Sequence, residues 1–211
     1  ILTPDETSDT PEAHHETHEA PTYAQAQYVF TTIQDALQCD DDNLKAVSFM
    51  FFAEFAPFYA EKKALFATVS QVHSRDVRTQ YEQLNTLLAL IEPDTDVDRP
   101  MITRFLNSRT WRVRSMTYRL LRHIACDDLH PQLLSAYRKT TRDYDKLVIL
   151  QAFTHQYGPE VFELLKNELL VSTTPQIQQL IAEMLPAYHD AKTVSQWLVA
   201  VYRDLPDDLV L

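Results

Sequence analysis

Residues 110–140 read TWRVRSMTYRLLRHIACDDLHPQLLSAYRKT. The first half of this stretch has a helical period, because apolar side chains recur at Val113, Met116 and Leu120. An acidic turn at 127–128 interrupts the period, and a second helical segment follows it. The stretch therefore predicts two helices that are joined by a short turn and run in opposite directions.

Helical segments of this kind recur along the chain at a near-constant spacing. The second helix of each pair is expected to begin at Asn43, Asp76, Thr110, Asp143 and Thr174, at spacings of 33, 34, 33 and 31 residues. A period between about 30 and 40 residues is the signature of a stacked repeat array. Further helical segments lie around these, at 24–37, 60–72, 99–108, 130–139, 158–170 and 191–205. The sequence predicts an all-α fold of five antiparallel helix pairs plus one closing helix.

Two local features recur in several units, a Val-Arg pair that opens the second helix and an acidic turn that follows it. They occur at Val77-Arg78, Val113-Arg114, Asp127-Asp128 and Asp190. In this pattern, residues 24–205 resemble the short HEAT-like repeats of the PBS-lyase type, found in bacterial adaptor and phycobilin-lyase-related proteins. The usual turn glycine is missing almost everywhere, and units four and five lack the Val-Arg pair. Tetratricopeptide repeats share the period, but their Trp, Gly, Tyr and Ala positions are absent.

The resemblance implies a specific architecture. It is a right-handed α-solenoid of about five HEAT-like helix pairs plus a closing helix. In such arrays the second helix of each unit lines the concave groove. We expect the repeat domain to span residues 23–211.

Residues 1–22 differ from the rest of the chain in composition. They carry six acidic residues and three prolines but no Lys or Arg. Such a segment buries too little apolar surface to offset the entropy of ordering, so we expect a disordered acidic tail or linker. His14, His15 and His18 lie in it, one residue short of the zinc-protease spacing, and we predict no metal site there. Because the chain starts at Ile1 rather than Met, we expect a fragment of a longer protein.

Composition argues against several classes of function. Gly158 is the one glycine in the chain, which excludes glycine-rich phosphate loops. No Ser, His or Asp stands in a nucleophile context, so we predict no catalytic residue and no cofactor. Cys39 and Cys126 lie in different units and are expected to be unpaired thiols in a reducing compartment. We therefore expect a cytoplasmic protein, with the soluble domain of a membrane-anchored protein as the alternative.

Positive charge is concentrated in the middle of an acidic chain. The net charge is -11, yet residues 99–146 contain 11 basic and 4 acidic residues, and nine of the basic residues are arginine. On a helical wheel of residues 110–124, the arc opposite the apolar side collects basic and aromatic side chains. We predict a partner-binding site that consists of Trp111, Arg112, Tyr118, Arg119, Arg122, Arg138 and Arg142.

The same arginines have an alternative structural role. In the HEAT-like family, the arginine that Arg114 matches forms a ladder with acidic residues of neighbouring units, and Glu82 or Asp145 are candidate partners for the others. Stability features are expected elsewhere, with Ser74, Ser108 and Thr174 as helix N-caps.

The function that fits these features best is a non-enzymatic protein-protein interaction scaffold or adaptor. Its groove and central Arg/aromatic patch would hold an acidic peptide or an acidic protein surface, since arginine binds carboxylates in a bidentate manner. A nucleic-acid-binding HEAT-like protein and a HEAT-like enzyme are the alternatives. We do not expect nucleic acid as the partner, and we expect membrane contact only through an anchor outside this chain. The sequence does not indicate an oligomeric state.

Overall fold

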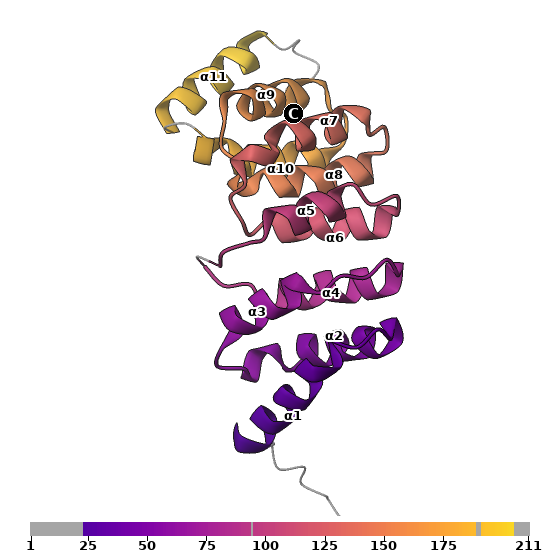
Figure 1. Ribbon diagram of the computed structural model, residues 1–211. Coiled ribbons are helices and arrows are strands. Elements are labelled where there is room, and N and C mark those ends of the chain that lie inside the picture. Colours follow the sequence, from indigo (N-terminus) through magenta and orange to yellow (C-terminus); the bar gives the residue numbers. More distant parts are fainter. Residues whose placement is uncertain (1–22, 94, 189–190, 205–211) are drawn as a thin grey trace, which may run out of the picture.

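The computed structural model describes residues 23–93, 95–188 and 191–204 (Figure 1). The described residues form α-helices and short 3-10 turns, without a strand. The helices are α1 (Tyr23–Ala36), α2 (Asp42–Phe55), α3 (Lys62–Gln71), α4 (Val77–Leu90), α5 (Arg99–Leu106), α6 (Trp111–Leu121), α7 (His130–Lys139), α8 (Asp143–Ala152), α9 (Pro159–Val171), α10 (Pro175–Tyr188) and α11 (Ala191–Asp204). The prediction of an all-α fold is confirmed.

The helices are packed in sequence order. The even-numbered helices α2, α4, α6, α8 and α10 pack against one another in that order, each odd-numbered helix from α1 to α9 packs against the even-numbered helix that follows it, and α11 packs against α10. Figure 1 shows the resulting stack, with α1 and α2 at one end and α9 to α11 at the other. Contacts are therefore mostly between adjacent units, as expected for a chain built from repeats.

The core runs along the whole stack between the two rows of helices. Each even-numbered helix buries apolar residues at a period of three or four, because 3.6 residues make one turn. In α6 the buried apolar side chains include Val113, Leu120 and Leu121, each fully buried. Burying one such Val or Leu side chain contributes about 1.5–3 kcal/mol before entropy is counted.

A serine turn precedes three of the even-numbered helices. The serine hydroxyl oxygen accepts a hydrogen bond from the backbone N–H two residues later, at 2.9–3.3 Å. The pairs are Ser74 with Asp76, Ser108 with Thr110, and Ser172 with Thr174. The predicted N-cap role of Ser74 and Ser108 is wrong by two residues, because the cap of α4 is Asp76 and α6 begins after Thr110.

Buried polar side chains join successive units at the opposite ends of these helices. Gln156 is fully buried, and its Oε1 accepts from the Cys126 N–H at 2.8 Å. Its Nε2 donates to the carbonyl of Ile124. The Tyr188 hydroxyl donates in the same way to the Phe153 carbonyl, one unit further along. These hydrogen bonds fix the turns between successive units.

Other sequence predictions fall partly outside the described residues. The tail at 1–22, with its three histidines, and the turn residue Asp190 lie there.

No disulfide joins Cys39 to Cys126, and Cys126 is buried. Among the helices of residues 23–93, 95–188 and 191–204, none has the length and apolar character needed to cross a membrane.

Candidate functional site

Three predicted arginines lie together along the exposed side of α6. Arg112, Arg119 and Arg122 are all exposed. Arg112 and Arg119 are seven residues apart, which places them about two turns apart on one helix face, and Arg122 is the C-cap residue one turn after Arg119. The α6 helix forms here because its opposite side is apolar. Burial of that side in the core offsets the conformational entropy that the helix loses on ordering. We call these three residues the arginine face.

Arg112 is held by an aromatic ring of the preceding unit. Its guanidinium carbon lies 4.0 Å from the centroid of the Tyr81 ring on α4. A cation–π contact at an exposed position contributes about 0.5–1 kcal/mol and orients the guanidinium without neutralising it. Sequence reasoning missed Tyr81, because its place beside Arg112 follows only from the packing of α4 on α6.

Tyr118 corrects the predicted patch. The helical wheel placed it on the exposed arc, whereas the structure leaves it only 3% exposed. Residues of α7 lie beside it on that flank of α6, and a wheel of one helix contains no neighbouring helix. Burial raises the pKa of the Tyr118 hydroxyl, and the nearby Arg114 guanidinium opposes part of that rise.

Trp111 is half-buried and also belongs to the inner flank of α6. Its ring centroid lies 6.0 Å from that of Tyr118 in a tilted contact. The guanidinium carbon of Arg114 lies 5.5 Å from the Trp111 ring. The structure therefore divides the predicted patch into two parts, an exposed arginine face and an inner flank formed by Trp111, Arg114 and Tyr118.

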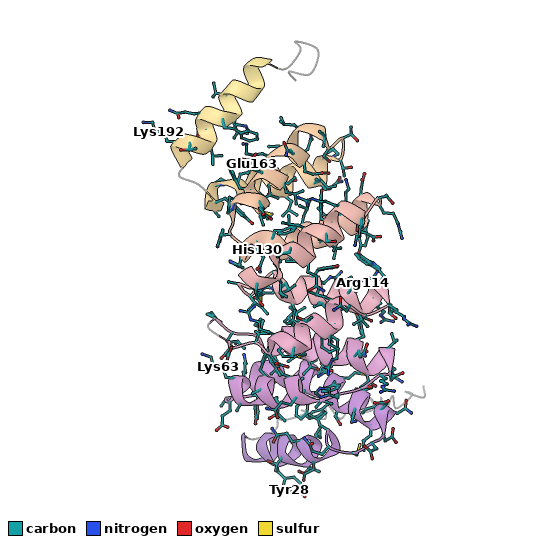
Figure 2. All side chains as sticks on the ribbon, turned by 45° about the horizontal axis from the view of Figure 1, so that its top comes forward. Tyr28, Lys63, Arg114, His130, Glu163 and Lys192 are labelled. Carbon is teal, nitrogen blue, oxygen red and sulfur yellow. The ribbon has the colours of Figure 1, made fainter. Side chains whose placement is uncertain are left out.

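Arg114 has backbone partners in its own unit. Its Nη1 donates to the Ser108 carbonyl at 2.7 Å and to the Arg109 carbonyl at 3.0 Å. The family resemblance implied acidic partners in neighbouring units, and no ion pair of Arg114 is found within the described part of the chain. Arg114 thus stabilises the loop before α6. Figure 2 labels it at one edge of the stack.

Arg138 and Arg142 flank the loop between α7 and α8. Arg138 is exposed in the last turn of α7. Arg142 precedes α8, and its Nη1 lies 3.7 Å from Oδ2 of Asp145. The Arg142 side chain is 76% exposed, and such a surface pair contributes about 0–1 kcal/mol. The ion pair with Asp145 therefore holds the Arg142 side chain only weakly.

Within the described part of the chain, no ion pair joins Arg112, Arg119 or Arg122 to a carboxylate. Of the predicted site arginines, Arg142 alone forms an ion pair with a described residue. The remaining four, Arg112, Arg119, Arg122 and Arg138, are exposed. Uncompensated exposed cations of one sign attract an anionic partner and speed its association. Chemically, this surface can bind carboxylates or phosphates through guanidinium groups.

No group of three or more His, Cys, Asp or Glu side chains that could hold a metal ion occurs among the described residues.

Comparison of the chain with protein-family models, with curated proteins and with solved structures gives no match in any of the three.

Proposed function

We propose that the chain is a right-handed HEAT-like α-solenoid that acts as a non-enzymatic scaffold. Its arginine face would hold an acidic peptide or an acidic protein surface. The serial packing of the even-numbered helices supports the solenoid, because it gives one continuous row of second helices. A row of this kind offers an extended surface on which a peptide can lie across several units.

The choice of an acidic partner rests on one observation. Arg112, Arg119 and Arg122 are exposed on one helix and have no carboxylate partner among the described residues. Arginines that served a structural ladder would be paired with acidic residues of neighbouring units. Arginine is also enriched in the residues that dominate binding energy at protein interfaces.

Binding of fluorescent peptides of graded acidity, from neutral to wholly glutamate, tests the proposal. Wild-type protein should bind more tightly as peptide acidity rises. The double variant Arg119→Glu/Arg122→Glu should weaken binding of the acidic peptides by at least tenfold, about 1.4 kcal/mol, because it replaces two attractive charges by two repulsive ones.

The matched control is Lys63→Glu/Lys192→Glu, which changes the net charge equally. Both lysines are exposed, and Figure 2 labels them on the opposite side of the stack from Arg114. This control should bind the acidic peptides nearly as well as the wild type. Equal losses in the two double variants would show a general charge effect and contradict the site. Tighter binding of single-stranded RNA or DNA than of any peptide would favour the nucleic-acid alternative.

A further inference from the structure

A pocket of about 190 Å³ lies between α6, α7 and the end of α5, on the inner flank of α6. Its polar lining includes Asn107, Arg114, Tyr118, Gln132 and Lys139. No Asp or Glu is among the described residues that line it, so Arg114 and Lys139 share the pocket without a carboxylate from the described part of the chain. A water takes about 30 Å³ and a drug-sized ligand needs about 300–1,000 Å³, so the volume suits one small anionic group.

The hydrogen bond from Arg114 to the Ser108 carbonyl does not require a positive charge, because neutral side chains make the same bond in two other units. Gln80 on α4 donates to the Ser74 carbonyl at 2.9 Å, and Gln178 on α10 donates to the Ser172 carbonyl at 2.8 Å. These neutral amides make the bond that Arg114 makes to Ser108, at the same position of their helices. Arg114 uses Nη1 for the two loop carbonyls, and its guanidinium also lies within hydrogen-bonding reach of the Tyr118 hydroxyl, so the donors on Nη2 and Nε face the pocket side of α6 together with that hydroxyl.

The next unit contains a carboxylate at the corresponding place. Lys146 on α8 lies 32 residues after Arg114, and its Nζ is 3.1 Å from Oε1 of Glu168 on α9. Glu168 lies 32 residues after Ala136, which lines the pocket on α7. The Glu168 side chain is 11% exposed, so this pair is largely withdrawn from water. In the unit of Arg114, a methyl group stands where the next unit places a carboxylate.

We propose that the pocket binds a single carboxylate group of a peptide partner, in the position that the Glu168 carboxylate takes one unit later. Arg114 and Lys139 supply the charge, and Tyr118 forms part of the wall. Because a guanidinium is already fixed by two loop carbonyls, little further ordering is needed on binding. This site is separate from the arginine face, so either can fail alone.

Titration with sodium acetate at constant ionic strength tests the site with the simplest carboxylate. The chain has two tryptophans, Trp111 and Trp197, whose indole N–H signals can be followed by NMR. Acetate should shift the Trp111 signal in a saturable manner, because Arg114 lies against that ring, and should leave Trp197 nearly unchanged. Arg114→Gln should weaken the response at least tenfold while leaving the melting temperature within a degree or so of the wild type, since Gln80 and Gln178 make the same loop bond.

A substitution that places a carboxylate in the pocket tests the same proposal in the opposite direction. Ala136→Glu recreates the arrangement of Glu168 with Lys146 and should raise the melting temperature by about 2–4 °C while it abolishes the acetate response. Ala182→Glu, on the exposed side of α10, is the control and should do neither. A lowered melting temperature for Ala136→Glu would overturn the proposal, as would an acetate response that persists in Arg114→Gln.

Two peptides distinguish the source of the carboxylate. One carries a single internal glutamate and an amidated end, and the other carries only a free C-terminal carboxylate. A shift of Trp111 by either supports the site and identifies the side chain or the chain end as the ligand. A response to acetate with none to either peptide would overturn the assignment to a peptide partner. Saturation by inorganic phosphate at lower concentration than by acetate would overturn the assignment to a carboxylate.

Discussion

At the scale of single residues, the buried amide of Gln156 stabilises the junction between two units. It accepts from the Cys126 N–H and donates to the carbonyls of Leu121 and Ile124, so one side chain is hydrogen-bonded to three backbone groups. Leaving a buried backbone group without a hydrogen-bond partner costs about 1–3 kcal/mol of desolvation free energy.

Gln156→Leu should therefore lower the free energy of unfolding by about 1–3 kcal/mol, although it adds apolar volume at a fully buried position. Urea denaturation followed by circular dichroism measures this difference. Gln176→Leu, at an exposed position of α10, makes the same chemical change and should lower stability little. If the two variants are equally stable, Gln156 does not hold the junction as described.

The residues of the predicted site show what could be predicted from the sequence and what could not. The exposure of Arg112, Arg119 and Arg122 was predicted from the helical wheel, because they lie opposite the apolar side of their own helix. Tyr118 was wrongly predicted to be exposed, because its burial depends on neighbouring elements that a wheel of one helix does not contain, and residues of α7 line the same pocket. The backbone partners of Arg114 also lay beyond sequence, since they depend on the conformation of the loop at 108–109.

At the scale of the helix, N-terminal capping is the clearest local signal. Asp76 caps α4, and its Oδ2 accepts from the Thr79 N–H at 2.7 Å. That hydrogen bond is the largest cause of the lowered pKa of Asp76, followed by the Thr79 hydroxyl. The predicted cap Ser74 lies two residues earlier, where it turns the chain toward the helix. Both Ser and Asp favour N-caps, so residue type alone did not choose between them.

Two substitutions at Asp76 separate the hydrogen bond from the charge. Asp76→Ala should lower the stability at neutral pH by about 1 kcal/mol, because the cap is lost. Asp76→Asn should retain most of it, because the amide oxygen still accepts from Thr79.

The pH dependence of these variants follows from the sign of the pKa shift. The pKa of Asp76 is lowered on folding from the ordinary value of 3.8, so its ionised form stabilises the fold above that value. This contribution is lost as the pH falls below 3.8 through the lower folded-state pKa. Melting temperatures across this range should therefore fall less steeply for Asp76→Asn than for the wild type. The exposed-loop variant Asp96→Asn is the control, and an unchanged slope in Asp76→Asn would contradict the assignment.

Helix positions were otherwise well predicted. The second helices were expected to start at Asn43, Asp76, Thr110, Asp143 and Thr174, and the structure begins them within one residue of each. This agreement arises because the repeat period, the apolar spacing and the polar turns all mark the same positions. Contacts between helices have no such redundancy, which is why Tyr81 beside Arg112 was not foreseen.

At the scale of the whole molecule, charge is separated along the stack. An acidic chain with a net charge of -11 carries its positive charge in the central units, between residues 99 and 146. The negative ends should repel an acidic partner while the centre attracts it, so the partner would be directed to α6. Such steering acts mainly on the association rate and is weakened by salt, since the screening length is about 8–10 Å near physiological ionic strength.

The association rate of a wholly glutamate peptide, followed by stopped-flow fluorescence over a series of salt concentrations, tests the arginine face most directly. We expect the rate for the wild type and for Lys63→Glu/Lys192→Glu to fall steeply with salt. For Arg119→Glu/Arg122→Glu, the rate should be at least tenfold lower at low salt and nearly independent of it, with an unchanged melting temperature. The same salt dependence in both double variants, or a lowered melting temperature with unchanged association for Arg119→Glu/Arg122→Glu, would contradict the claim that these arginines receive an acidic partner.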